Sequence, residues 1–141
     1  MTPTQKTLIK QSWLKVLPIS EQAAALFYER LFTIDPETKP LFANSDMAEQ
    51  GAKLMKSINL VVDSLDNLEA LVPAIQEMGV RHAGYGVKDA DYDTVGAALL
   101  WTLEQGLGED FTDETKNAWA TAYGLLADTM KSAAAEAKQV A

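Results

Sequence analysis

The chain has 141 residues, of which 48% are hydrophobic and 23% charged, which is the composition of one globular domain and argues against disorder. It contains no cysteine and one histidine, which excludes disulfide frameworks, thiol nucleophiles and metal sites that need two histidines. Its 12 basic and 20 acidic residues give a net charge of −8, which disfavours nucleic acids and anionic membrane surfaces as partners.

Targeting and membrane signals are not expected from the sequence. The first eleven residues are polar and lack the apolar core of a signal peptide. The longest charge-free stretch in the C-terminal half, 94–103, has ten residues, whereas a membrane span needs about 20. We therefore expect a cytoplasmic protein with no membrane span.

Two helices are predicted in the N-terminal part of the chain. Residues 2–5, Thr-Pro-Thr-Gln, are typical of a capping box with proline at the first helical position. Apolar residues then recur at helical spacing, which predicts a helix from about Pro3 to Leu17. Ser20 is predicted to cap a second helix, on which Tyr28 shares an apolar face with residues one turn away.

The next two helices are predicted from a proline and from an apolar line. Asp35, followed by proline, predicts a short helix that ends near Phe42. A long helix is predicted to begin at about Met47, with Gln50 one turn before Leu54 on the same apolar line. The side chain of Gln50 therefore breaks an otherwise apolar face.

The following segment is interrupted by proline and glycine. Asn67 is predicted to cap it, and Pro73 divides it into two shorter pieces. The second piece is predicted to run from Ala74 to about His82, because the Gly-Tyr-Gly of residues 84–86 stops it.

Two longer helices complete the predicted fold. Asp89 or Asp91 is predicted to cap the first, and Thr112 or Asp113 the second, whose alanine-rich tail after residue 132 is expected to fray. No strand-like alternation, repeat or low-complexity linker occurs. All 141 residues are therefore predicted to form one all-α domain, with helices too unequal for an up-and-down four-helix bundle.

His82 is the residue whose role needs explaining. It shares an apolar helical face with Met78 and Gly79. One interpretation is a core histidine hydrogen-bonded to a carbonyl, and the other is an axial metal ligand. A lone histidine does not hold a bare metal ion firmly, but it can hold a haem iron because the porphyrin supplies the in-plane ligands.

Tyr28 and Gln50 place hydrogen-bonding groups on otherwise apolar helix faces. Each has an ordinary interpretation: the hydroxyl of Tyr28 reaches the surface or a carbonyl, and Gln50 is exposed at a helix start. Together they could instead donate to a ligand inside an apolar pocket. Phe42 is more often a plain core residue than the wall of a cofactor site.

A set of landmarks occurs in one order and at specific spacings, namely Trp13, Tyr28, Pro36, Phe42, Gln50-x-x-x-Leu54, Arg81-His82, Tyr92-x-x-Val95-Gly96 and Ala118-Trp119-x-x-x-Tyr123-Gly124. This set covers the chain from about residue 5 to residue 130. It resembles the globin family, and within that family the single-domain bacterial haemoglobins and the haem domain of flavohaemoglobins.

The resemblance implies an all-α globin fold, a three-over-three helical sandwich around a b-type haem. It implies that His82 is the proximal iron ligand, that Tyr28 and Gln50 contact the bound ligand, and that Leu54 lies one turn beyond the distal position. It also implies that Phe42 packs on the porphyrin. The further haem contacts that it implies are Lys53, Arg81, Val87, Tyr92 and Val95.

The implied function is the binding of dioxygen and other diatomic gases. Donors from Tyr28 and Gln50 would stabilise the partial negative charge of bound dioxygen. Reversible oxygen binding or transport is the first hypothesis, and oxidation of nitric oxide to nitrate by a nitric-oxide dioxygenase is the alternative, so the enzyme class stays open. A haem-free sensor or interaction module is the third hypothesis. The sequence has no glycine-rich dinucleotide fingerprint, so we expect an enzymatic cycle to need a separate reductase.

One departure from the family pattern concerns the last helix. Close bacterial relatives carry a glutamate at the position of Ala134, and Glu136 is about 200° away around the helix. The tyrosine–glutamate pair that supports the proximal histidine in those relatives is therefore incomplete, although Tyr92 is present. This departure favours ligand binding over cleavage of an O–O bond.

Overall fold

The computed structural model describes residues 1–140, with side chains described as far as residue 137. Within residues 1–140 the chain forms six α-helices and four 3₁₀ segments, and no strand. The elements are α1 (Pro3–Val16), η1 (Leu17–Ile19), α2 (Ser20–Ile34), η2 (Pro36–Phe42), α3 (Met47–Asp63), η3 (Leu65–Leu71), α4 (Val72–Gly84), α5 (Asp89–Leu107), η4 (Gly108–Asp110) and α6 (Asp113–Val140).

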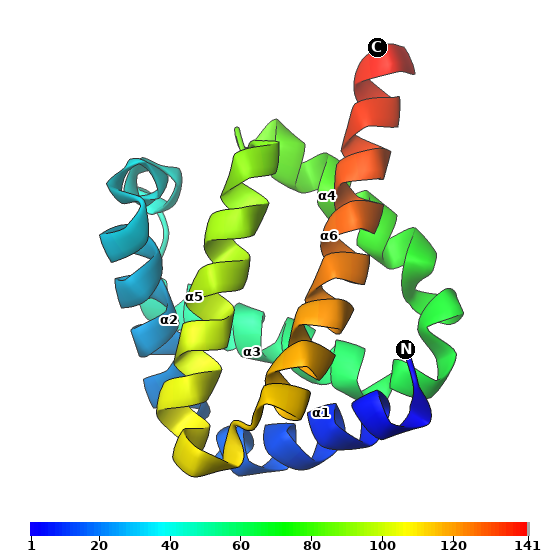
Figure 1. The fold of residues 1–141 in the computed structure, drawn as a ribbon. Coiled ribbons are helices and arrows are strands. Elements are labelled where there is room, and N and C mark those ends of the chain that lie inside the picture. Colours follow the sequence, from blue (N-terminus) through cyan, green and yellow to red (C-terminus); the bar gives the residue numbers. More distant parts are fainter. Residues whose placement is uncertain (141) are drawn as a thin grey trace.

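The helices form two layers of three, with α1, α3 and α4 over α2, α5 and α6 (Figure 1). Contacts between the layers join α4 to α6, α1 to α6, and α3 to α2, while α2 also packs along α5. This is the expected three-over-three sandwich. Among the described residues, no helix combines the length and the hydropathy needed to cross a bilayer.

Most predicted helix starts are confirmed, and the sequence chemistry explains them. The capping box is present, because the hydroxyl of Thr2 accepts from the N–H of Gln5 at 3.1 Å and the Gln5 side chain accepts from the N–H of Thr2 at 3.0 Å. Asp35 caps η2 by accepting from the N–H of Glu37 at 3.1 Å. Asp46 caps α3 by accepting two backbone N–H groups.

The predicted cap at Ser20 is wrong. The 3₁₀ segment η1 runs directly into α2, so Ser20 already has helical angles (φ −58°, ψ −38°), whereas a capping residue is extended.

Side chains also bond to the backbone at the starts of the last two helices. At the start of α5 the side chain of Asp91 accepts from the N–H of Lys88 at 2.8 Å. At the start of α6, Thr112 accepts from the N–H of Thr115 at 3.2 Å.

The helix that carries His82 is bounded as the sequence chemistry requires. The chain kinks at Asn67 (φ −147°, ψ 54°), and Pro73 lies in the first turn of α4, where its missing N–H costs no hydrogen bond. After α4, Gly86 has φ +92° and the N–H of Val87 donates to the carbonyl of His82 at 3.1 Å. This Schellman motif turns the chain sharply directly after the histidine.

The fraying expected after residue 132 stays a prediction, although this tail is helical in the structure. Helix α6 continues to Val140, and its last turns extend past the other helices in Figure 1. Ala133 is buried, because α4 packs along this part of α6. Tertiary packing of a small side chain, together with the high helix propensity of alanine, extends the helix beyond its sequence-predicted end.

The largest part of the core lies where α1, α3, α5 and α6 meet, around Trp13 and Trp119. Their ring centroids are 6.1 Å apart. The indole of Trp13 donates to the side chain of Asn59 at 2.9 Å, and that of Trp119 donates to Ser12 at 2.8 Å. Both large aromatic side chains are therefore buried with their polar atoms satisfied.

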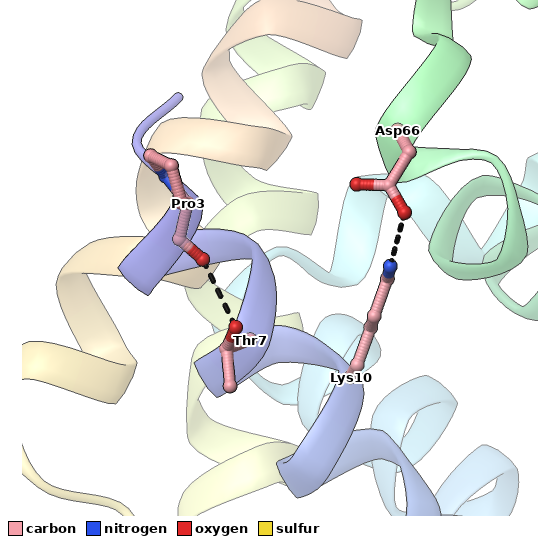
Figure 2. Close-up of polar contacts among 4 residues, drawn as sticks. All are labelled: Pro3, Thr7, Lys10 and Asp66. Atoms are coloured by element: carbon pink, nitrogen blue, oxygen red, sulfur yellow. Dashed lines mark hydrogen bonds and ion pairs between the residues drawn. The ribbon is translucent and has the colours of Figure 1, made fainter.

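A surface ion pair joins α1 to η3. The ammonium of Lys10 lies 2.6 Å from the carboxylate of Asp66 (Figure 2). Its hydrogen bond and charge lower the pKa of Asp66. Both side chains are exposed, so screening by water keeps the contribution of the pair to stability small.

The first turn of α1 is closed by a side chain, because the hydroxyl of Thr7 donates to the backbone carbonyl of Pro3 at 3.0 Å (Figure 2).

The approach of α4 to α6 depends on a residue without a side chain. A Cβ atom at Gly79 would lie 2.4 Å from the carbonyl oxygen of Met130 and 2.6 Å from its Cα. The backbone of α6 cannot yield as a flexible side chain would. Gly79 therefore sets how close the helix that carries His82 lies to α6.

We predict that Gly79→Ala lowers the free energy of unfolding by about 1–3 kcal/mol, because the added methyl group forces α4 away from α6. Gly84→Ala is the matched control on the same helix, since a Cβ there meets nothing within 4 Å. It should leave stability unchanged or raise it by up to about 1 kcal/mol through helix propensity. Urea unfolding of both variants measures the difference, and equal effects would contradict the close approach.

Candidate functional site

Tyr28 is surrounded by aromatic side chains from α2 and η2. Its ring centroid is 5.3 Å from that of Phe42 and 6.2 Å from that of Phe32, and the rings of Phe32 and Phe42 are 5.7 Å apart. Tyr28 also meets Phe27 edge-on at 5.0 Å. Offset and edge-on contacts of this kind fix the orientation of the phenol.

Leu54 from α3 and Val95 from α5 pack at the edge of these aromatic side chains, and both are half-buried. The structure thus brings four of the sequence-predicted site residues into one cluster built from α2, η2, α3 and α5. We call it the Tyr28 cluster, and its predicted site residues are Tyr28, Phe42, Leu54 and Val95. The cluster is apolar apart from the hydroxyl of Tyr28.

Gln50 lies beside Tyr28, on the neighbouring helix α3. Burial raises the pKa of Tyr28 above its ordinary value, and hydrogen bonding with the Gln50 side chain partly offsets this rise. The phenol therefore stays protonated at neutral pH and is available as a donor. Two hydrogen-bonding groups that the sequence placed on separate helices are brought to the same place.

The contact between α2 and α3 next to this pair is also close, although less so than that between α4 and α6. A Cβ atom at Gly51, the neighbour of Gln50, would lie 2.9 Å from the Cβ of Ala24, which is one turn before Tyr28. This contact fixes the position of α3 on α2, and with it the separation of Gln50 from Tyr28.

His82 lies on α4, away from the Tyr28 cluster in sequence and on a different helix pair. Its Nδ1 atom is 2.7 Å from the carbonyl oxygen of Met78. A carbonyl only accepts, so Nδ1 carries the proton and Nε2 keeps a free lone pair in the neutral ring. The two interpretations of His82, a hydrogen bond to a carbonyl and an axial metal ligand, are therefore compatible. The carbonyl engages Nδ1 and orients the ring, and Nε2 stays available to a metal.

The remaining predicted contacts lie in other surroundings. Lys53 is exposed and pairs with Glu49 of the preceding turn at 3.7 Å, and Arg81 is exposed on α4. Val87 and Tyr92 pack in a second cluster, between α4, α5 and α6. The structure therefore does not gather all the predicted contacts in one place.

The residues present fit a haem. The interior is divided into three clusters of buried side chains, although a domain of this size usually has one contiguous core. Half-buried apolar side chains lie at the margins of these clusters, and a large apolar group held between them would cover such edges. Within the described residues no group of three His, Cys, Asp or Glu side chains could hold a bare metal ion. A single free imidazole nitrogen suits an iron whose other ligands come with the porphyrin.

Three features of the site were missed by sequence reasoning. Phe32 is not among the predicted site residues, although its position four residues after Tyr28 on the same helix could have placed it beside the phenol. The carbonyl of Met78 has no signature in the sequence beyond its spacing from His82. Tyr123 donates from its hydroxyl to the backbone carbonyl of Tyr92 at 2.6 Å, a contact between distant segments that no local pattern indicates.

We predict that Gly51→Ala lowers the free energy of unfolding by about 1–3 kcal/mol by overpacking the contact between α2 and α3. The collision is with a side chain, so Ala24→Gly should relieve it. Ala24→Gly alone should cost roughly 0.5–1 kcal/mol in helix propensity. In urea unfolding the double variant should lose less than the sum of the single losses, and additive losses would show that the two positions are not in contact.

Comparison with known proteins identifies the family of the chain. The Globin family model matches residues 25–130. A flavohemoprotein of Rhizobium meliloti (strain 1021) is 36% identical over 106 residues, which cover 74% of this chain and 26% of that protein. A flavohemoprotein of Bacillus thuringiensis subsp. konkukian (strain 97-27) is 36% identical over 112 residues, which cover 78% of this chain and 27% of that protein. The chain thus spans about a quarter of the length of these curated relatives.

A solved structure matches over the whole chain. It is an engineered carbene transferase derived from a Rhodothermus marinus protein that is assigned as a nitric oxide dioxygenase, and it has a TM-score of 0.88 at 29% identity, covering 99% of this chain and 97% of that chain. Membership of the family that these relatives share implies a haem cofactor. With its three-over-three helical sandwich, its lone histidine on α4 and these matches, the chain belongs to the globin family.

Proposed function

We propose that the chain is a b-type haem protein of the cytoplasm that binds dioxygen and converts nitric oxide to nitrate. The similarity to flavohemoproteins and to a protein assigned as a nitric oxide dioxygenase supports this reaction over oxygen transport alone. The observation that carries the proposal is the buried Tyr28 phenol, paired with Gln50 in an apolar cluster. When bound, haem supplies the iron that takes up dioxygen and the redox chemistry that oxidises nitric oxide.

The protein side chains have separate roles in this proposal. His82 would hold the iron through Nε2, because its Nδ1 atom is already bonded to the carbonyl of Met78, which fixes the ring. Tyr28 and Gln50 donate hydrogen bonds to the diatomic ligand, and the surrounding phenylalanines exclude water. Low water content strengthens such bonds, because the dipoles are fixed in advance and less screened.

The reaction also needs an electron from outside the pocket. Nitric oxide, dioxygen and one electron give nitrate, so each turnover consumes one reducing equivalent. We assign this electron to a flavin- or nicotinamide-dependent reductase.

Sustained turnover distinguishes the proposed reaction from oxygen binding alone. The reduced, haem-loaded chain is mixed with nitric oxide in aerobic buffer, with and without a flavin reductase and NADH. We expect nitrate to exceed haem many-fold when the reductase is present. One nitrate per haem, in spite of demonstrated re-reduction by the same reductase, would identify an oxygen-binding protein instead.

We predict that Tyr28→Phe speeds dioxygen release by about 10- to 150-fold, the loss of one hydrogen bond to a partly charged acceptor of roughly 1.5–3 kcal/mol. Gln50→Leu should have a smaller effect, because its longer side chain loses more entropy when it is fixed. Carbon monoxide, a poorer acceptor, should respond much less to either change. Stopped-flow dissociation rates for both gases test this, and equal shifts for the two gases would show that Tyr28 is not the donor.

We predict that His82→Ala abolishes axial ligation, because the chain has no second imidazole. Haem content and the absorption spectrum after expression with excess haem are the measurements. Added free imidazole should restore a histidine-like spectrum by occupying the space that the side chain leaves. Gln76→Ala, an exposed position on the same helix, is the control. A histidine-like spectrum of His82→Ala without added imidazole would refute the assignment.

A further inference from the structure

A cavity of about 530 Å³ lies where the end of α4, the start of α5 and the last part of α6 meet. Small apolar side chains, among them Ala83 and Ala134, line part of it, and Lys88, Asp89 and Lys131 line another part. None of His82, Tyr28 and Gln50 is among its lining residues. The cavity therefore lies apart from the Tyr28 cluster but adjoins the His82 side of the site, because Ala83 directly follows His82 and because Val87 and Tyr92 are two of the predicted haem contacts.

The hydroxyl of Tyr92 is the unusual polar group of this cavity. Tyr92 lines it and is 8% exposed, yet among the described residues its hydroxyl has no hydrogen-bond partner. By contrast, the indoles of Trp13 and Trp119 and the hydroxyl of Tyr123 all have partners. Burial, and then the charge of Asp89, raise the pKa of Tyr92, so its hydroxyl stays a donor at neutral pH. The ring of Tyr92 is buried, but its hydroxyl is not among the buried unpartnered atoms of the described residues, so the hydroxyl is accessible to water or to a ligand in the cavity.

Two cations accompany this donor. Lys131 lies over the ring of Tyr92, with its Nζ atom 5.6 Å from the ring centroid. Within the part of the chain that the structure describes, neither Lys88 nor Lys131 forms an ion pair. Two lysines against Asp89 make this cavity locally positive in a chain whose net charge is −8. An anion with one negative charge is thus favoured, while Asp89 opposes a second charge.

We propose that this cavity binds a small organic monocarboxylate. The carboxylate accepts from the hydroxyl of Tyr92 and lies within the field of Lys88 and Lys131, while its apolar body packs on Ala83 and Ala134. Inorganic phosphate fits less well, because it carries more charge and has no apolar body for the alanine side chains. This site takes a different class of ligand from the diatomic gas, lies beside two predicted haem contacts and goes beyond the proposed reaction.

Benzoate is the probe, with benzyl alcohol as its neutral counterpart of similar shape. Each is titrated into the ¹⁵N-labelled full chain, loaded with haem, reduced and saturated with carbon monoxide so that the iron is already occupied. We expect saturable amide shifts confined to residues 83–92 and 131–135 with benzoate, and at least about tenfold weaker binding of benzyl alcohol. Equal binding of the two probes, or benzoate shifts elsewhere, would overturn the proposal.

Variants test the individual contacts by the same titration. Tyr92→Phe should weaken benzoate binding about tenfold, the loss of a hydrogen bond to a charged acceptor. Lys131→Ala should weaken it by about three- to fivefold, because the ammonium is partly screened, and the matched control Lys116→Ala should leave it unchanged. Lys131 is not in the core, so its variant remains informative if Tyr92→Phe fails to fold.

Filling the cavity is the third test. Ala134→Met should abolish benzoate binding by occupying the space beside Tyr92, whereas Ala120→Met, an exposed position elsewhere on α6, should not. Retained binding in Ala134→Met, or no loss of affinity in Lys131→Ala, would overturn the site. None of these measurements depends on nitric oxide turnover, so failure here leaves the proposed reaction standing, and the reverse also holds.

Discussion

The approach of α4 to the backbone of α6 at Gly79 is the contact on which the proximal side of the site depends. No side chain can lie between Gly79 and the carbonyl of Met130, so the two helices meet at backbone distance. His82 lies three residues further along α4, and its ring is held by the carbonyl of Met78 in the preceding turn. The helix orients the imidazole, and α6 positions the helix. Directly after α4, the Schellman motif at Gly86 turns the chain sharply toward α5.

The distal side is held by a similar device but has a different chemical character. Gly51 against Ala24 fixes α3 on α2, and this contact brings Gln50 beside Tyr28. The phenol is surrounded by aromatic rings, and such burial of a polar group is costly unless the group is hydrogen-bonded. Apolar surroundings with two hydrogen-bond donors, Tyr28 and Gln50, suit a diatomic ligand that carries partial negative charge. The two glycine contacts therefore set how close α4 lies to α6 and how close α3 lies to α2, and a haem would lie between α3 and α4.

The C-terminal part of α6 connects this site to the carboxylate cavity. The hydroxyl of Tyr123 donates to the backbone carbonyl of Tyr92 and holds α6 on α5, but about three turns later two alanines of α6, Ala134 and Ala135, leave space beside the same tyrosine. Globin relatives that resemble this chain carry a glutamate at the position of Ala134, and here the hydroxyl of Tyr92 has no partner among the described residues. The Nδ1 atom of His82 thus bonds to the carbonyl of Met78 rather than to a carboxylate.

Local chemistry in the sequence determined where most helices begin and end, because the caps at Thr2, Asp35 and Thr112 act within one turn. It failed at Ser20, where a preceding 3₁₀ segment overrides local propensity. The lone histidine and the polar residues on apolar faces, Tyr28 and Gln50, were visible as unusual from the sequence. Which of them meet, and whether Nε2 of the histidine is free, was decided only by the tertiary structure, because glycine contacts between distant segments set the helix separations and have no local signature.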